Sequence, residues 1–348
     1  MKKLLIIGSS TIHTYNYINL VQDYFDEILL LSHEKNENST VNTQQINFRL
    51  GLNIFNSIKK IKKIVKEFNP SIIHIHQANS YAFISTLALK NSTIPQVLTA
   101  WGSDILINPR KSMILKKMLI FSLRSIDKAT SDSMYMASEM KIYNSNLDIK
   151  IVNFGIDVNG KKVDKENIIY SNRSHNTLYN IDKVIYSFYK FVQLNSDWRL
   201  VVGATGKNTT KLKQLVKSLN IEDKVEFIGW VDSKINNKMY QKSKIYVSIP
   251  SSDATSISLL EAISNDCICF VSNLPANGEH ILDSINGFIE PCLESIDFKK
   301  YDTIHQELLE KVNSIRKINY LKDTNKKKFL SIYDELLKKG RNENNTIS

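Results

Sequence analysis

Short apolar runs alternate with helix-like stretches along the chain of 348 residues. In the first half, runs of strand length, each bounded by polar or turn residues, lie at residues 4–7, 27–31, 72–75 and 95–99. Between and after them, helical patterns cover residues 16–24, 54–68, 81–89 and 113–125. Strands that are apolar throughout and alternate with helices predict a parallel sheet covered on both faces.

The pattern stops in a polar stretch at residues 158–165 and then starts again. The second half predicts helices at 181–193, 210–219, 236–243 and 257–264, and strands at 198–202, 225–228, 245–249 and 268–271. We therefore expect an α/β protein with two doubly wound domains, at residues 1–160 and 161–319. A helix at 320–339 is expected to pack back toward the first domain, and residues 340–348 are expected to form a disordered tail.

The composition is that of a globular protein, since 42% of the residues are apolar and 23% are charged. Three cysteines are too few for a disulfide framework, and Cys267 and Cys269 in an apolar run predict a buried, reduced pair. The apolar start is too short for an export signal, and no run approaches the length of a membrane span. These features predict a cytoplasmic protein, without a metal site.

Positive charge is concentrated in the first half. Residues 1–165 contain 21 Lys and Arg against 13 Asp and Glu, within a total formal charge of +11. Two predicted helices concentrate this excess, with a solvated helix face as the alternative to a binding surface. One carries Lys59, Lys60, Lys62, Lys63 and Lys66, and the other carries Lys111, Lys116, Lys117, Arg124 and Lys128. A basic amphipathic helix can lie on an anionic bilayer, so we expect peripheral contact with the inner face of the cell membrane. No motif or stacking platform indicates a nucleic acid partner.

Residues 250–264 form a strand–loop–helix sequence rich in small residues. The first turn of the helix would offer the N–H groups of Ser256, Ile257 and Ser258 to an anion, assisted by the helix dipole. Glu261 shares a helix face with Ile257 and Ser258, and a carboxylate there can accept two hydrogen bonds from a ribose diol. A strand–loop–helix sequence by itself favours a structural role over a nucleotide site, and the spacing of its acidic residues decides between the two.

The spacing from Asp253 to Glu261 resembles the acidic-x7-Glu motif of retaining glycosyltransferases of family 4, which have the GT-B architecture of two Rossmann-like domains facing a central cleft. The resemblance implies that Asp253 lies near the transferred sugar and that Glu261 binds the ribose. The family usually has Glu at the first position, so Asp253 leaves the donor sugar open.

Further matches follow in the family's order. Arg173 in Ser171-Asn-Arg173 is implied to meet the donor diphosphate, but Tyr179 replaces the usual lysine six residues later, so Lys183 or Lys207 would supply that charge. The remaining matches imply a phosphate loop at Gly203 and a base-holding stretch at Trp230 and Val231. Three further stretches resemble family motifs: Asn153-Phe-Gly-Ile-Asp157, Asn277-Gly-Glu279 and Asn286-Gly287.

In the first half, Gly8 and His13 resemble the family's loop near donor and acceptor, and the Gly-x-Gly-x-x-Gly fingerprint of dehydrogenases is absent from that loop. Trp101 replaces a family histidine; its ring could stack on a sugar, and Asp104 could bind hydroxyls or cap a helix. His74 and His76 alternate on a strand and face the same side. We expect His76 to contact the acceptor together with His13, Trp101 and Asp104. A purely structural role is the alternative for both His74 and His76.

The resemblance implies a retaining, metal-independent hexosyltransferase that needs no cofactor and moves a sugar from a nucleoside diphosphate donor, expected to be UDP-linked. The expected acceptor is a hydroxyl of a glycan or lipid-linked glycan in bacterial surface polysaccharide synthesis, such as lipopolysaccharide or capsule. Asp253 and Arg173 are the expected catalytic residues. Two alternatives stay open: a nucleotide-sugar epimerase of the same architecture, and a nucleotide-sugar binding protein without activity.

Overall fold

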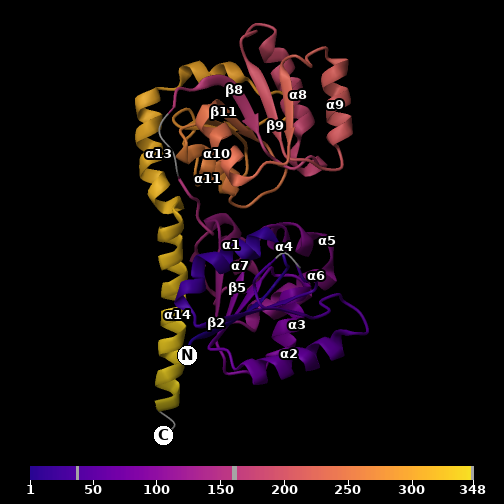
Figure 1. The fold of residues 1–348 in the computed structure, drawn as a ribbon, viewed down its shortest axis with the longest axis vertical. Coiled ribbons are helices and arrows are strands. Elements are labelled where there is room, and N and C mark those ends of the chain that lie inside the picture. Colours follow the sequence, from indigo (N-terminus) through magenta and orange to yellow (C-terminus); the bar gives the residue numbers. More distant parts are fainter. Residues whose placement is uncertain (37–38, 159–162, 346–348) are drawn as a thin grey trace. The chain divides into compact units, whose positions relative to one another are not determined.

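A computed structural model describes residues 1–36, 39–158 and 163–345, and the chain forms two compact units (Figure 1). Unit 1 comprises residues 1–155 and 322–348, and unit 2 comprises residues 156–321. The chain thus enters unit 2 five residues before the expected boundary at 160, and it returns to unit 1 after residue 321. Half of the polar stretch that prompted this boundary, residues 159–162, lies outside the described residues.

Unit 1 contains a seven-stranded sheet in which every neighbouring pair is parallel, in the order β3-β2-β1-β4-β5-β6-β7. Its strands are β1 (Lys3–Ile7), β2 (Glu27–Ser32), β3 (Thr43–Gln45), β4 (Ile72–His76), β5 (Gln96–Thr99), β6 (Lys128–Ser131) and β7 (Asp148–Ile151). Its helices are α1 (Ile12–Val21), η1 (Gln22–Tyr24), α2 (Ile54–Phe68), α3 (Ser80–Ala88), α4 (Ser103–Leu106), α5 (Asn108–Lys111), α6 (Met113–Arg124), α7 (Met134–Tyr143) and α14 (Lys322–Asn345).

Unit 2 contains a six-stranded parallel sheet in the order β10-β9-β8-β11-β12-β13. Its strands are β8 (Glu166–Ser171), β9 (Arg199–Gly203), β10 (Val225–Gly229), β11 (Ser243–Ser248), β12 (Ile268–Ser272) and β13 (Gly287–Glu290). Its helices are η2 (Thr177–Tyr179), α8 (Ile181–Val192), α9 (Thr209–Ser218), α10 (Ser233–Lys242), α11 (Ile257–Ser264), α12 (Pro275–Gly278), η3 (Phe298–Thr303) and α13 (Gln306–Tyr320).

Both faces of the sheet in unit 2 are buried. Along β8, Ile169 belongs to one apolar cluster, whereas its neighbours Ile168 and Tyr170 belong to another. Successive side chains of a strand point to opposite faces, so the two clusters lie on opposite sides of the sheet. Both sheets also follow the doubly wound strand order, with a switch point between β1 and β4 and another between β8 and β11. The predicted α/β class with two doubly wound sheets is confirmed.

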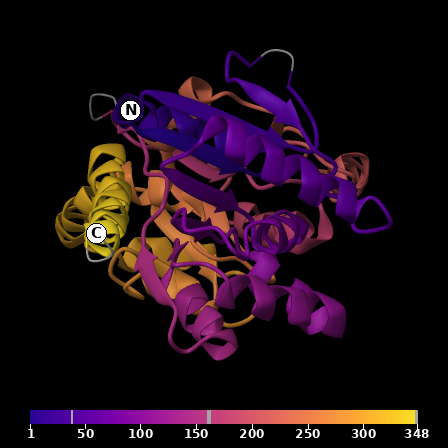
Figure 2. The ribbon, with the colours of Figure 1, turned by 90° about the horizontal axis from the view of Figure 1, so that it is seen from below.

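Helix α14 completes the core of unit 1. Phe329, Ile332 and Tyr333 are buried in the same cluster as Tyr17 of α1. Figures 1 and 2 both show the N-terminus of the chain beside α14. The helix continues to Asn345, so the prediction of a tail from residue 340 was wrong for residues 340–345, and residues 346–348 lie outside the described part.

The cysteines agree with the sequence analysis, because Cys267 and Cys269 are free and buried. Cys292 is free and exposed. No helix among the described residues has the length and apolar character required to cross a membrane.

Candidate functional site

The candidate site in unit 2 lies beyond the carboxyl ends of β8 and β11, the two strands at the switch point of the sheet. Ligands of open α/β sheets bind at such points. Arg173 follows β8 by two residues, and Asp253 lies in the loop between β11 and α11. Asn180 holds the start of this loop, since its side-chain amide donates to the carbonyl oxygen of Ile249 (2.8 Å) and to the hydroxyl of Ser251 (3.0 Å).

Arg173 connects three segments of this site. Its Nη2 donates to Asp253 Oδ2 at 2.7 Å, and its Nη1 donates to the hydroxyl of Ser256. The guanidinium also lies over the ring of Tyr179, 4.5 Å from the ring centroid. The residue that replaces the family's lysine therefore supports Arg173 by a cation–π contact.

The electrostatics of the pair favour a fixed charge on Arg173. Burial by itself would lower the pKa of Arg173, but the carboxylate of Asp253 together with Tyr246 and Tyr179 outweighs this effect, and the pKa lies above its usual value. Burial raises the pKa of Asp253, although Arg173 acts in the opposite direction. The site thus holds a permanently charged guanidinium next to the loop that leads into α11.

The start of α11 is arranged as the sequence suggested. Ser256 is the N-cap residue, but its side chain makes no capping hydrogen bond, because its hydroxyl receives the Arg173 guanidinium. Ile257 and Ser258 are partly buried in the first turn. A helix start carries unpaired N–H groups and partial positive charge, so this turn and Arg173 together form an electropositive site.

Glu261 lies one turn further along α11 and is partly buried. Its Oε2 accepts a hydrogen bond of 3.2 Å from the side-chain amide of Asn236, in the first half of α10. The sequence analysis did not identify Asn236, which lies in a polar stretch without a distinguishing pattern.

The other predicted donor residues of unit 2 lie at or just after the carboxyl ends of β9 and β10. Gly203 ends β9 and packs closely, since a Cβ placed there would lie 3.1 Å from the hydroxyl of Tyr170. Trp230 follows Gly229, whose φ of +69° suits glycine, and 77% of the Trp230 side chain is exposed. Val231 is partly buried and Lys207 is exposed. Lys183, the other candidate for the missing charge, forms an ion pair with Glu294.

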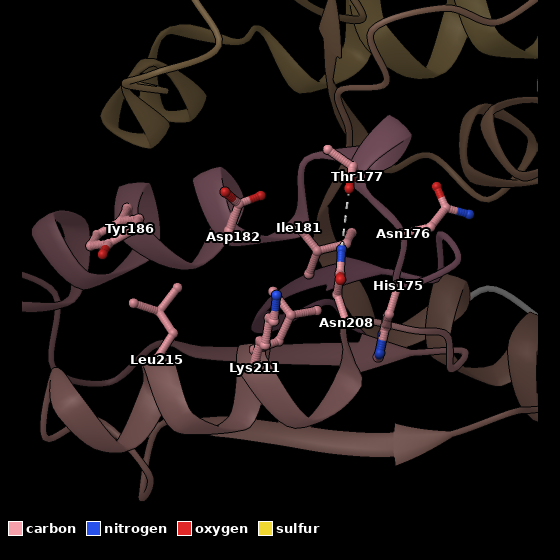
Figure 3. A pocket seen from close by; sticks show the side chains of 10 residues that line it. His175, Asn176, Thr177, Ile181, Asp182, Tyr186, Asn208, Lys211 and Leu215 are labelled. Atoms are coloured by element: carbon pink, nitrogen blue, oxygen red, sulfur yellow. Dashed lines mark hydrogen bonds between the residues drawn. The ribbon is translucent and has the colours of Figure 1, made fainter.

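A further pocket of about 380 Å³ lies between α8 and α9 (Figure 3). His175, two residues after Arg173, is among the residues that line it. Two other lining residues, Asn208 and Thr177, are joined by a hydrogen bond of 3.5 Å. Asp182 and Lys211 bring opposite charges to the lining. None of the predicted site residues lines this pocket.

In unit 1, three predicted residues gather at the carboxyl ends of β1, β4 and β5. The rings of His13 and His76 lie 5.4 Å and 6.0 Å from the ring of Trp101. His13 is exposed and Trp101 is partly buried. Gly8 permits this packing, because a Cβ there would lie 2.8 Å from the Cβ of His76.

The two histidines of β4 have different surroundings. His74 is buried and saturated: its Nδ1 lies 2.7 Å from the hydroxyl of Tyr17 and 2.6 Å from that of Tyr333, and its Nε2 lies 2.7 Å from Thr99 Oγ1. His76 is also buried, but neither ring nitrogen has a hydrogen-bond partner among the described residues. His74 is therefore structural, and the position of His76 gives it no direct opening to solvent.

Asp104 serves the backbone of unit 1. Its Oδ2 accepts hydrogen bonds from the N–H groups of Ala78 (2.6 Å) and Trp101 (3.2 Å), and its Oδ1 accepts one from Trp101 (3.1 Å). The side chain is 5% exposed. It fixes the two loops that follow β4 and β5, whereas the N-cap of α4 is Gly102, so Asp104 does not cap the helix as the alternative suggested.

No group of three or more His, Cys, Asp or Glu side chains in the described residues is arranged to hold a metal ion. The charges gathered in unit 2 are instead suited to an anion beside a hydroxyl-bearing group. The guanidinium and the start of α11 supply positive charge, and Glu261 supplies a hydrogen-bond acceptor.

Comparison with known proteins shows that both halves of the chain match family models. Residues 2–133 match "Glycosyl transferase 4-like", and residues 154–317 match "Glycosyl transferases group 1". The two matches lie one after the other and together include most of the chain.

Three similar proteins illustrate the relationship. N-acetyl-alpha-D-glucosaminyl L-malate synthase of Bacillus anthracis is 22% identical over 81% of this chain and 79% of its own length. An uncharacterised glycosyltransferase of Methanocaldococcus jannaschii is 23% identical over 88% of this chain and 86% of its own. The crystal structure of Anabaena HepE in complex with UDP has a TM-score of 0.79 at 13% identity, and the match includes 96% of this chain and all of that one.

Proposed function

Because the chain belongs to the GT-B glycosyltransferases, with a glycosyl transferase 4-like first half and a group 1 second half, we propose that it transfers a sugar from a UDP-sugar to a hydroxyl group. The observation that carries this proposal is the joining of Arg173, Asp253 and Ser256 at the start of α11, with Glu261 one turn away. Similar proteins crystallised with UDP and with UDP-glucose support the choice of donor.

In this proposal the two ends of UDP bind to different parts of the site. The diphosphate lies against Arg173 and the first turn of α11, where positive charge can stabilise the leaving group as it forms. Glu261 accepts the hydroxyls of the ribose. Gly203 and Lys207 lie along the phosphate side, Trp230 and Val231 hold the base, and in unit 1 Gly8 approaches the donor phosphates.

The proposed reaction retains the configuration at the anomeric carbon. The bond from that carbon to the phosphate oxygen breaks, and the acceptor oxygen forms its bond on the same face. The acceptor proton passes to the departing phosphate, so no protein nucleophile is needed. Asp253 holds Arg173 and orients the sugar, and the guanidinium and helix start take the role that a metal ion has in other transferases.

Substitution of Arg173 and Glu261 tests this function. Arg173→Met should lower kcat/KM by about 100-fold or more, because it removes a charge-stabilising contact to the leaving group. Glu261→Gln should chiefly weaken UDP binding, measured by calorimetry. Lys217→Met, at an exposed position on α9, is a matched control expected to behave like the wild type. If wild-type protein bound no UDP and moved no sugar in a panel of nucleotide sugars and acceptors, the proposal would be abandoned.

The same panel distinguishes the reaction types. The anomeric configuration of the product, read by NMR, decides between retention and inversion. Conversion of a UDP-sugar without acceptor would instead indicate an epimerase.

The proposed acceptor is a glycan or lipid-linked glycan of a bacterial surface polysaccharide. In this proposal His13, Trp101 and His76 of the protein lie on the acceptor side, and Asp104 shapes the loops around them. The surface of α2 supports an acceptor at a membrane. All five of its lysines are exposed, and at its start the side chains of Leu52 and Phe55 are 99% and 76% exposed. Exposed apolar groups beside positive charge are suited to an anionic bilayer.

Vesicle flotation tests this contact. The wild type should float with vesicles of phosphatidylglycerol and phosphatidylcholine and remain behind with phosphatidylcholine alone. Changing three α2 lysines to Glu should abolish flotation: Lys59, Lys62 and Lys66. The same change in charge on α9 of unit 2 is the control and should leave flotation intact: Lys211, Lys213 and Lys217. If both variants lost flotation equally, vesicle binding would depend only on the net charge of the protein and not on α2.

A further inference from the structure

Behind Glu261 in unit 2 lies a network of neutral hydrogen-bonding side chains. It joins β8 and the residue after it, α10 and β11, and Asn236 connects it to Glu261 in α11. Its members are Tyr170, Asn172, Asn236, Tyr240 and Tyr246, and the three tyrosines are fully buried.

Neighbouring side chains fix the orientation of the Asn236 amide. Its Oδ1 accepts hydrogen bonds from the hydroxyl of Tyr170 (2.7 Å) and from Asn172 Nδ2 (2.9 Å). Because the carboxylate of Glu261 can only accept, the Nδ2 group of Asn236 must face it, and the oxygen then faces the donors Tyr170 and Asn172. A flipped amide would place its oxygen against the carboxylate and its N–H groups against another donor.

Asn172 is oriented in turn by its bond to Asn236 Oδ1, and two tyrosines complete its hydrogen bonds. Its Nδ2 also donates to the hydroxyl of Tyr240 (2.8 Å), and its Oδ1 accepts from the hydroxyl of Tyr246 (3.2 Å). Asn172 precedes Arg173, so the segment that bears the guanidinium and the helix that bears Glu261 connect to the same network. The absence of a side chain at Gly203 leaves room for it, because a Cβ there would lie 3.3 Å from the Cβ of Asn172.

We propose that Asn236 is a positioning residue that orients the carboxylate of Glu261 for a nucleotide ribose and thereby sets the preference of the site for ribose over deoxyribose. This inference rests on the proposed function. A carboxylate oxygen has two acceptor positions, so Oε2 can hold the Asn236 amide and still accept a ribose hydroxyl. The amide limits the rotation of the carboxylate, which reduces the ordering cost when the diol binds.

The test compares the binding of UDP and 2′-deoxy-UDP by calorimetry. Wild-type protein is expected to prefer UDP by about tenfold or more, the scale of one hydrogen bond to a charged group. Asn236→Ala should weaken UDP binding by about tenfold and 2′-deoxy-UDP binding, which keeps only the 3′-hydroxyl, by a clearly smaller factor, so the preference shrinks. A merely structural role would weaken both ligands together. Asn237→Ala, the neighbouring asparagine whose Oδ1 accepts from Asn265 (3.3 Å), is the matched control and should keep the preference.

Tyr170→Phe is a second variant in case Asn236→Ala does not fold. It removes the hydroxyl that holds Asn236 Oδ1 and should reduce the preference in the same direction, by a smaller factor. If the wild type fails to bind UDP, the proposed function itself is lost. If the wild type discriminates and both variants discriminate equally well, the function stands and the role of Asn236 is overturned.

Discussion

His76 is a buried histidine whose surroundings exclude the charged form. Its ring packs against Tyr17 at 4.4 Å between centroids and against Phe154 at 6.0 Å. Burial lowers its pKa to about 3, far below the ordinary value of 6.5. The ring is therefore neutral in the folded protein throughout the physiological range, whatever role it has toward an acceptor.

Acid should therefore destabilise the fold through His76. The unfolded chain takes up a proton near pH 6.5, whereas the folded state resists it until about pH 3, so stability falls as the pH drops from 6.5 toward 4. The loss by pH 4 is roughly 3 kcal/mol for this group. His76→Phe should shrink the difference in unfolding free energy between pH 7 and pH 4, measured with denaturant. His305→Phe, at an exposed position, is the control; equal slopes in the two variants would refute the assignment.

The sequence carried much of the site but not its detailed contacts. The spacing of Asp253 and Glu261 predicted the candidate donor site, because that pattern lies within one local strand–loop–helix sequence. The contacts of Asn236 and Asp104 could not be predicted, because their partners are distant in the sequence. Asn236 donates to Glu261, 25 residues away, and Asp104 accepts from Ala78, 26 residues away. Such hydrogen bonds depend on the tertiary fold and leave no periodic pattern.

Among the elements, long amphipathic helices were predicted best. The expected ranges for α2 and α11 agree with Ile54–Phe68 and Ile257–Ser264. Helix α10 begins earlier than expected, at Ser233, because the side chain of Asp232 accepts the N–H of Ile235 (2.8 Å) and caps it.

Five strands escaped the sequence analysis, among them β8 in the centre of unit 2. β8 contains only three consecutive apolar residues, Ile168 to Tyr170, and it follows a polar stretch. Its position between β9 and β11 buries it, so pairing on both sides compensates for a weak local signal. The other missed strands, β3, β6, β7 and β13, give a weak signal because they are only three or four residues long.

Lys165 stabilises the ends of two helices in unit 2. Its ammonium group donates to the carbonyl oxygens of Tyr240 (2.9 Å) in the last turn of α10 and Asn265 (2.6 Å) at the end of α11. A cation at this end also complements the helix dipole. It thereby helps to hold the two helices that carry Asn236 and Glu261.

Removal of this cation should destabilise unit 2. Lys165→Met leaves both carbonyls without the donor, and the expected loss is about 1–3 kcal/mol in unfolding free energy, measured by denaturant titration. The exposed Lys211→Met on α9 should change little. An unaltered midpoint for Lys165→Met would show that water replaces the ammonium group without cost.

The order of the chain makes unit 1 discontinuous, since residues 1–155 and 322–348 build it together. Besides its apolar contacts, α14 contributes Glu335, which pairs with the buried Lys128 at 2.7 Å, and Tyr333, which contacts His74. Among the described residues, one apolar cluster lies wholly in unit 1 and two others lie wholly in unit 2. Each unit should therefore respond separately to damage in its own core.

Substitution of one core residue in each unit tests this separation. Phe329→Ala in α14 should destabilise unit 1 by about 3–5 kcal/mol, the usual cost of truncating a buried phenylalanine. Hydrogen exchange followed by mass spectrometry should then show faster exchange across β1, β2 and β4, with β8 and β11 unchanged. Phe270→Ala in β12 is the matched variant and should give the reverse pattern. Faster exchange in both units from either substitution would show that the two cores unfold as one cooperative unit, despite their separate apolar clusters.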